Sequence, residues 1–298
     1  MKRLVGIWML LLTSTAAAQT RGPLDLANAQ VPPGARKIAY GSDAFHFGEL
    51  RVPSTKGPHP VAIVVHGGCW VAKLGNLDER AVAFDNMRPL AAALTDAGLA
   101  TWNVEYRRLG NAGGGWPGTF QDVGRAADFV RTLAASNQLD LTRVIAIGHS
   151  AGAHLVMWLA ARAKLPMTSE LYTRTPLTLS GVVSLDGPPD LKATIQVQQP
   201  ICGSPVITNL IGGTPDQQPE RYRAASPIEL LPLGVPQEFF VGRMFAAQAA
   251  PYEAATKRAG DVVHATVLPE ADHFVFIDPQ SKIWPQVLAA VQRLVSKP

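Results

Sequence analysis

Short runs of consecutive apolar residues alternate along this chain with longer segments whose apolar residues recur at helical spacing. The apolar runs predict strands at 61–65, 99–104, 144–147, 179–185, 238–241 and 262–268. The segments with helical spacing predict helices at 81–97, 119–135, 151–163 and 282–295. Strands that are apolar at every position are typical of a parallel sheet covered on both faces. The alternation therefore predicts one α/β domain, with a mostly parallel sheet and helices on both of its faces.

Three segments add detail to this predicted sheet. Residues 37–40 and 45–52 predict an antiparallel hairpin at one edge of it. Thr119 and Asp122 are spaced as in a capping box, which predicts that the helix 119–135 begins there. The stretch at about 187–236 contains Pro, Gln and Gly residues and separates two predicted strands. We expect this stretch to form a small cover over one end of the sheet.

The first eighteen residues have the pattern of a secretory signal. Lys2 and Arg3 precede an apolar segment at 4–12, and three alanines at 16–18 supply small residues for cleavage before Gln19. An apolar segment of this length is too short to span a bilayer, which takes about 20 residues. We expect residues 1–18 to be removed and 19–298 to form the periplasmic or secreted domain, without stable membrane insertion. An uncleaved anchor is the alternative interpretation.

Composition and charge narrow the possible functions. Hydrophobic residues make up 47% of the chain and charged residues 17%, which excludes a disordered chain. Lys and Arg exceed Asp and Glu by 27 to 23, an excess too small and scattered for a nucleic-acid-binding surface. Two cysteines exclude a Cys-rich metal site. Export would permit a disulfide between Cys69 and Cys202, and two separate buried thiols are the alternative.

The sequence GHSAG at residues 148–152 is the clearest chemical signal. A predicted buried strand leads into it and a predicted apolar helix follows it. This is the setting of a nucleophile elbow, in which the glycines allow a tight turn that presents the serine hydroxyl. We therefore predict that Ser150 is a catalytic nucleophile. The alternative is an ordinary glycine-rich turn between a strand and a helix.

A serine hydroxyl needs a general base, and His273 is the best candidate. It follows the last predicted strand, at the carboxyl edge where open α/β sheets assemble their sites. His154 lies one helical turn after Ser150, and we expect a structural role for it. His264 lies within a predicted strand, and we expect it to pack in the fold. For His273 the alternative is an ordinary surface histidine.

The sequence HGGCW at residues 66–70 follows the strand 61–65 at the same edge as Ser150. Glycines there bring backbone N–H groups close to a substrate, so Gly67 and Gly68, with the N–H of Ala151, are predicted to form an oxyanion hole. We assign three further residues to the substrate pocket: His66, Trp70 and Trp116. For Trp116, which follows three glycines, plain packing is the alternative.

The order of these two motifs resembles the α/β-hydrolase superfamily. HGGxW in particular resembles its esterase and arylformamidase (kynurenine formamidase-like) branch. The resemblance covers nearly the whole chain after residue 18. It implies a serine esterase or amidase with a Ser–acid–His triad, which acts on a small-molecule substrate and needs neither a cofactor nor a metal ion.

The triad acid departs from the pattern of the superfamily. Relatives usually carry it in a G-x-x-D sequence after the strand that here ends at Val241, but Phe245 stands in the Asp position. Some lipases of this superfamily instead hold the acid on the preceding strand, and Asp186 stands at that place. We therefore predict Asp186 as the acid. We interpret Asp190 as structural and expect Asp272 to point away from its neighbour His273, and a Ser–His dyad without an acid is the alternative.

The leading functional hypothesis is an exported serine hydrolase that cleaves carboxylic esters through an acyl-enzyme on Ser150. An arylformamidase or amidase is the nearest alternative by motif, although a signal peptide does not suit intracellular tryptophan breakdown. A catalytically weak binding protein with a hydrolase fold is the alternative from another class, and Phe245 at the usual acid position is the feature that motivates it.

Overall fold

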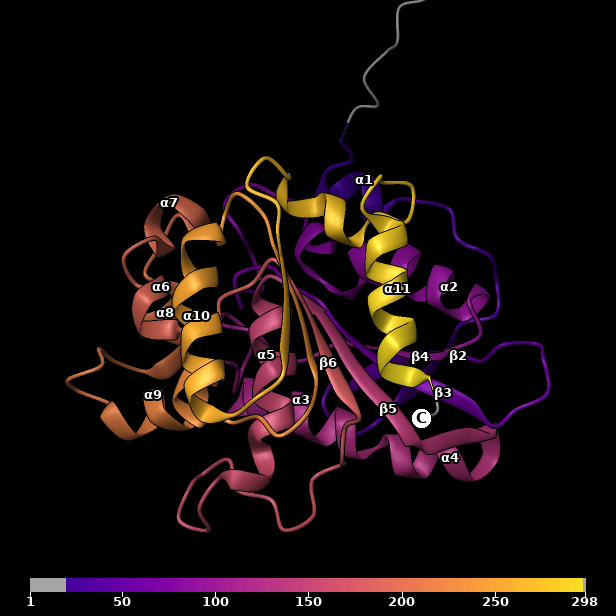
Figure 1. The fold of residues 1–298 in the computed structure, drawn as a ribbon, viewed down its shortest axis with the longest axis horizontal. Helices are drawn as coiled ribbons and strands as arrows, with labels where there is room; N and C mark the ends of the chain where they lie inside the picture. Colours follow the sequence, from indigo (N-terminus) through magenta and orange to yellow (C-terminus); the bar gives the residue numbers. More distant parts are fainter. Residues whose placement is uncertain (1–19, 297–298) are drawn as a thin grey trace, which may run out of the picture.

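A single twisted sheet of eight strands forms the centre of the structure, a computed structural model that describes residues 20–296 (Figure 1). The strand order is β1-β2-β4-β3-β5-β6-β7-β8. β2 pairs antiparallel with both β1 and β4, and all other neighbours are parallel. The strands are β1 (Arg36–Ala39), β2 (Phe47–Arg51), β3 (His59–Val65), β4 (Ala100–Val104), β5 (Leu139–His149), β6 (Gly181–Leu185), β7 (Gln237–Val241) and β8 (Val263–Val267).

The helices cover both faces of this sheet, which confirms the predicted α/β fold. One face is covered by α3 (Gly118–Asp128), α4 (Val130–Asn137), α5 (Ala151–Ala161) and α10 (Ala246–Ala259). The other is covered by α1 (Pro23–Ala27), α2 (Arg88–Asp96) and α11 (Trp284–Val295). The central strands β4, β6 and β7 are buried at every position, as their continuous apolar sequences predict.

Edge position explains one wrong prediction. His264 lies on β8, which has a neighbouring strand on one side only, and its side chain is 72% exposed. The expectation that His264 packs in the fold is therefore wrong, because this edge strand is only partly covered and leaves His264 and Val267 exposed. The early hairpin is confirmed, since β1 and β2 pair antiparallel at the opposite edge.

Two predicted helices are interrupted in the structure. The segment 81–97 forms two 3-10 turns, η1 (Glu79–Val82) and η2 (Phe84–Met87), before α2 begins. Pro89 lies in the first turn of α2, where proline is favoured because the backbone needs no N–H donor there. The predicted helix 119–135 is divided at Phe129 into α3 and α4.

The predicted capping box of Thr119 and Asp122 is wrong. α3 follows Pro117, and no side chain caps its first turn. The Asp122 carboxylate instead pairs with Nε2 of His46 at 2.8 Å and accepts two hydrogen bonds of 2.7 Å from the Arg107 guanidinium. Charge-assisted bonds inside the protein are stronger than a local bond to the backbone, so they determine the orientation of this carboxylate.

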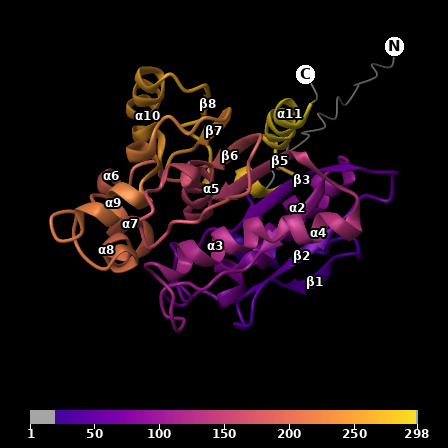
Figure 2. The same cartoon turned by 90° about the horizontal axis from the view of Figure 1, so that it is seen from below.

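Residues 187–236, predicted as a cover, contain four short helices and a 3-10 turn. These are α6 (Leu191–Thr194), α7 (Gln198–Cys202), α8 (Val206–Ile211), α9 (Pro219–Ala225) and η4 (Pro227–Leu230). Figure 2 shows the four helices grouped together at one end of the molecule. Two side chains of α5 hold α9, because the ring of His154 donates to the Ala225 carbonyl (2.9 Å) and that of Trp158 to the Ala224 carbonyl (3.0 Å).

A disulfide joins this cover to the centre of the fold. Cys69, in the turn after β3, is bonded to Cys202 at the end of α7, and their Cα atoms are 6.0 Å apart. The predicted signal segment 1–18 lies outside the described residues. Within residues 20–296, no helix combines the length and the apolar character that crossing a membrane requires.

The disulfide predicts a specific mass and stability behaviour. The bridge spans 133 residues, for which the chain-entropy model gives about 5 kcal/mol of stabilisation. We expect the unfolded, unreduced protein to take up no alkylating agent, and Cys69→Ser with Cys202→Ser to lower the free energy of unfolding by up to this amount. Intact mass spectrometry and urea denaturation measure both. Two alkylated thiols without reduction would show that the bridge is absent.

The buried histidine of α5 predicts a pH dependence of stability. Burial lowers the pKa of His154 from 6.5 to about 4. The unfolded chain therefore takes up a proton between about pH 6.5 and 4 where the folded protein does not, so stability falls as the pH falls through this window. The pKa difference corresponds to roughly 3 kcal/mol when fully expressed.

His154→Gln tests this prediction, because glutamine keeps an N–H donor for Ala225 and does not titrate. Urea denaturation of both proteins at pH 7 and pH 4.5 should show a smaller loss of unfolding free energy in the variant. If the two proteins lose the same amount, His154 is not a source of the acid sensitivity.

Candidate active site

Ser150 stands in the sharp turn between β5 and α5. Its backbone is in an unusual conformation, with φ of 56° and ψ of −121°. The flanking glycines are required by close contacts: a Cβ on Gly148 would lie 2.2 Å from the Gly152 carbonyl oxygen, and one on Gly152 would lie 2.1 Å from that of Val65. The N–H of Ser150 donates to the carbonyl of Leu185 on β6 (2.9 Å). The local sequence therefore folds into the strand–turn–helix geometry of a nucleophile elbow.

The structure brings Asp186 and His273 together. His273 is the first residue of η5 (His273–Ile277), and its Nδ1 lies 2.6 Å from Oδ2 of Asp186. The carboxylate is fully buried, and its other oxygen accepts a hydrogen bond of 2.8 Å from the Gly242 N–H. A carboxylate on Nδ1 holds the imidazole in the tautomer whose Nε2 accepts a proton. This is the arrangement predicted for Asp186 from its place at the end of β6.

The other candidate acids have different partners. The Asp190 carboxylate caps α6 by accepting from the N–H groups of Lys192 and Ala193 (2.8 and 3.2 Å). The Asp272 side chain is half-exposed and lies 3.3 Å from the guanidinium of Arg243. At the usual acid position Phe245 is buried, and its ring centre is 6.3 Å from that of His273. Asp186 is thus the carboxylate that contacts the histidine.

His149 contributes to the site in a way that the sequence interpretation missed. Its Nε2 donates a hydrogen bond of 3.0 Å to the backbone carbonyl of His273, and the two ring centres are 4.3 Å apart. Burial, and secondarily the charge that His273 can carry, hold the pKa of His149 well below 6.5. A neutral imidazole therefore anchors the backbone of His273. The signal was its position inside GHSAG, directly before the serine.

The HGGCW turn packs directly on Ser150. A Cβ on Gly67 would lie 2.8 Å from the Ser150 Cβ, and Gly68 has φ of 97°, a conformation that glycine favours. Ala151 is the first residue of α5, where a backbone N–H has no acceptor within the helix. The turn is therefore close enough to Ser150 to supply the predicted oxyanion donors. The donor roles of Gly67, Gly68 and Ala151 stay predictions.

The assignment of His66 to the substrate pocket is wrong. Its side chain is fully buried, with Nε2 3.0 Å from a Glu105 oxygen and Nδ1 2.8 Å from the Gly67 carbonyl. Its ring is stacked on Tyr106 at 4.3 Å. Burial by itself raises the pKa of Glu105, but the nearby His66 and Arg108 lower it overall, so this carboxylate is held charged. His66 is therefore a buried residue that packs under the HGGCW turn, and it has no exposed surface for contact with a substrate.

The two tryptophans assigned to the pocket have different positions. Trp70 lines a small cavity beside Ser150, and its assignment to the substrate pocket stays a prediction. Trp116 lines a separate surface cavity, where its indole N–H donates to Glu170 (2.7 Å) and its ring lies under Arg221. The prediction for Trp116 is wrong because its backbone N–H donates to the Leu210 carbonyl on α8. This bond attaches the loop of Trp116 to the cover, away from Ser150.

Ser150, His149 and His273 line one cavity of about 140 Å³. Most of its remaining wall is apolar, with side chains from several distant segments: Pro23, Leu74, Leu77, Val82, Met244 and Phe274. Within the described part of the chain, no three His, Cys, Asp or Glu side chains are grouped as metal ligands. The structure therefore places Ser150 and His273 at one cavity, with the buried Asp186 carboxylate bonded to the histidine.

The sequence matches the family described as BD-FAE over residues 50–241. The chain belongs to the BD-FAE family. The match extends from β2 to the last residue of β7 and includes the HGGCW turn, Ser150 and Asp186. None of the curated proteins matches the sequence.

Solved structures show the same fold at low sequence identity. A truncated carbohydrate esterase from gut microbiota has a TM-score of 0.70 at 19% identity, covering 90% of this chain and 98% of that one. Esterase B from Lactobacillus rhamnosis has a TM-score of 0.71 at 17% identity, covering 90% and 89%. Esterase Est2 from the planctomycete Thermogutta terrifontis has 0.67 at 18%, covering 88% and 91%. This BD-FAE protein therefore has the α/β-hydrolase fold.

Proposed function

We propose that this BD-FAE protein is an exported serine hydrolase that cleaves carboxylic esters through an acyl-enzyme on Ser150. The observation that carries the proposal is the position of His273, which is bonded to the buried Asp186 and lines the same cavity as Ser150. Several proteins with this fold are named esterases, which supports the same reaction class. One of them, Est2, is described with butyrate bound.

The proposed reaction has two steps, each assisted by His273. Its Nε2 takes the proton of Ser150 as Oγ bonds to the carbonyl carbon of the ester, and the backbone N–H groups of Gly68 and Ala151 stabilise the negative oxygen. His273 then gives the proton to the leaving alkoxide as its bond to carbon breaks, which releases an alcohol. Water activated by the same histidine splits the acyl-serine to a carboxylic acid.

Two neighbouring side chains orient His273 and favour its role as a general base. Asp186 accepts a hydrogen bond from the Nδ1–H group of His273 and stabilises the imidazolium as it forms. His149 anchors the backbone of His273, and because His149 is buried and neutral it adds no positive charge beside that imidazolium. A second cation at this distance would oppose protonation of the base.

Export is part of the proposal and is supported by the first eighteen residues. Their basic start, short apolar segment and alanine triplet are typical of a signal peptide. The Cys69–Cys202 disulfide suits an oxidising compartment such as a periplasm or the extracellular space. We propose a periplasmic or secreted location for residues 19–298.

Hydrolysis of N-formyl amides is the second candidate function. The HGGxW pattern at residues 66–70, which resembles that of arylformamidases, favours it. The same serine, histidine and oxyanion donors would act, with an aromatic amine as the leaving group in place of an alcohol. Comparing p-nitrophenyl acetate with p-nitroformanilide on one preparation separates the two candidates by their kcat/KM values.

Replacing the nucleophile tests the proposed mechanism. We expect Ser150→Ala to lower kcat on p-nitrophenyl acetate by roughly 10⁴–10⁶-fold, as loss of a triad serine does. A phosphonate should label wild-type protein once per chain, at Ser150. The matched control is Ser184→Ala, because Ser184 is also buried and its hydroxyl has no hydrogen-bond partner among residues 20–296. Labelling at another residue with Ser150 untouched would overturn the mechanism, and absence of serine-dependent turnover would leave the binding-protein interpretation.

Replacing the acid tests the departure from the usual triad. Asp186→Asn should lower kcat by roughly 10³–10⁴-fold, because asparagine cannot hold the reactive tautomer or stabilise the imidazolium. Asp190→Asn and Asp272→Asn are the matched controls and should keep most of the rate, since their carboxylates bond to a helix end and to a surface arginine. If Asp186→Asn keeps more than a tenth of the wild-type kcat, the Ser–His dyad gains support.

A further inference from the structure

Two cavities meet at Ser150, and they differ in size and lining. The first is the cavity of about 140 Å³ that His149 and His273 line. The second is a much smaller space of about 10 Å³, bounded by Trp70, Ala151, Pro188, Cys202, Val206 and Phe245 among others. Ser150 lines both. An ester carbonyl on Ser150 therefore has a roomy side and a confined side.

The proposed chemistry decides which part of the ester occupies each side. The leaving alkoxide must receive its proton from His273, so the leaving group lies in the cavity that His273 lines. The acyl group then extends away from His273, into the space bounded by Ala151 and Phe245. We name these the leaving-group cavity and the acyl cavity.

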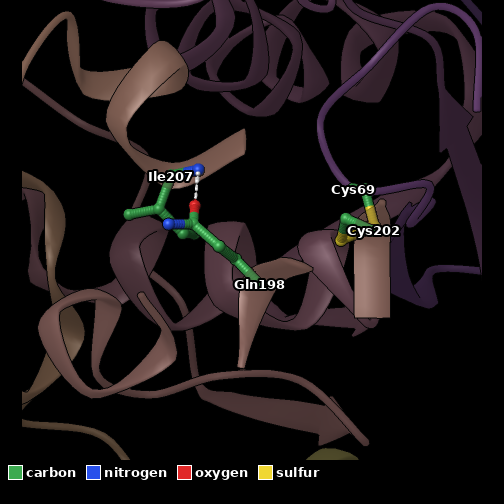
Figure 3. Close-up of a disulfide and its surroundings, with 4 residues drawn as sticks. All are labelled: Cys69, Gln198, Cys202 and Ile207. Atoms are coloured by element: carbon green, nitrogen blue, oxygen red, sulfur yellow. Dashed lines mark hydrogen bonds between the residues drawn. A yellow bond between two sulfur atoms is a disulfide. The ribbon is translucent and has the colours of Figure 1, made fainter. Parts of the chain in front are cut away.

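The acyl cavity is confined by residues that are firmly held. Phe245 and Trp70 are each 3% exposed, so both are packed against the surrounding fold. The cover side of the cavity is formed by α7, which the disulfide from Cys202 attaches to Cys69 beside the predicted oxyanion turn (Figure 3). The side chain of Gln198 also ties α7 to α8, because its Oε1 accepts from the Ile207 N–H at 2.8 Å (Figure 3).

The volume of the acyl cavity limits the acyl group. The volume of the acyl cavity, about 10 Å³, is less than a tenth of the 140 Å³ of the leaving-group cavity. We therefore expect a formyl or acetyl group to have room there and a longer chain to meet Phe245, Trp70 or α7. Interiors as closely packed as this one yield little to an added methylene.

The leaving-group cavity has the opposite character. Its side chains Leu74, Met244 and Phe274 are apolar, and Leu77 at its rim is 45% exposed. Pro23 completes the wall from the start of the described chain. A sugar hydroxyl group would need several polar partners, whereas a hydrocarbon or aromatic group gains by burial against such a surface.

The wall formed by Pro23 is anchored to the loop that carries His273. Two residues earlier, the Arg21 guanidinium donates two hydrogen bonds to the Asp278 carboxylate, one of them from Nε at 2.9 Å. Arg21 is a partly buried residue, and its pairing lowers the pKa of Asp278 although burial by itself raises it. The ion pair therefore fixes the segment of Pro23 in place as a wall of the cavity.

From these observations we infer the substrate class: esters of a one- or two-carbon acyl group with an apolar alcohol or phenol, with Phe245 setting the acyl limit. This inference rests on the proposed function, since it assigns the cavities by the proton that His273 transfers. It also gives a role to the residue that replaces the usual acid. Because Asp186 binds His273 from β6, position 245 is free to hold a large apolar side chain.

Two substrate series test the inference on the intact, disulfide-bonded protein. The first varies the acyl group in p-nitrophenyl formate, acetate, butyrate and hexanoate. The second keeps acetate and varies the alcohol from ethyl to butyl to hexyl, so that the apolar surface changes and the acidity of the alcohol does not. We expect kcat/KM to fall at least roughly tenfold from acetate to butyrate. It should rise from ethyl to hexyl acetate. Higher kcat/KM on butyrate or hexanoate than on acetate would overturn the assignment.

Adjacent residues provide a matched pair of variants. Phe245 lines the acyl cavity and Met244 the leaving-group cavity. We expect Phe245→Ala to reduce the acetate-to-butyrate ratio at least roughly tenfold, while Met244→Ala leaves that ratio within about twofold. Met244→Ala should instead change the ratio between hexyl and ethyl acetate. An unchanged acyl ratio in Phe245→Ala would remove Phe245 as the limiting residue.

Counting the active sites distinguishes a change in substrate preference from a folding defect and from a wrong proposed function. Active sites are counted with a phosphonate and rates are expressed per titrated site, and Phe245→Leu replaces the alanine variant if that variant does not fold. Ser150-dependent turnover that favours long acyl chains overturns only the substrate class. Absence of Ser150-dependent turnover on every ester and on p-nitroformanilide overturns the proposed function and the inference together.

Discussion

The close approach of three strand ends around Ser150 is the constraint on which the site depends. A Cβ on Gly67, Gly152 or Gly187 would lie within 2.8 Å of backbone or side-chain atoms of the turns that it faces. For Gly187 the nearest atom is the carbonyl oxygen of Ser150, at 2.2 Å. These glycines let the ends of β3, β5 and β6 converge, so the HGGCW turn, the serine and the buried carboxylate of Asp186 share one small volume.

The position of the acid on β6 affects more than the proton transfer. With Asp186 bonded to both His273 and the Gly242 N–H, the turn after β7 does not need to supply a carboxylate. Phe245 fills that place and closes one side of the space around Ser150. In this protein the choice of acid position and the size of the space available to an acyl group are therefore linked through one residue.

Most of the fold predictions that the structure confirms depend on local sequence, although the capping box at Thr119 and Asp122 is a local pattern that it contradicts. Continuous apolar runs identify strands buried in a covered parallel sheet, because every side chain in such a strand must avoid water. GHSAG identified the turn at Ser150, since only glycine tolerates the backbone contacts there. The wrong predictions concern residues whose surroundings come from distant segments: Trp116 bonds through its backbone to Leu210, and His66 pairs with Glu105.

The sequence by itself determined the α/β fold, the serine turn and the short list of candidate bases and acids, because periodicity and glycine spacing are local properties. The tertiary structure decided that Asp186 contacts His273, 87 residues away, and that Cys202 reaches Cys69. It also decided that His149 anchors His273. Such contacts depend on how strand ends and cover helices come together in space. Packing over the whole chain determines this arrangement, so a local sequence pattern does not determine these contacts.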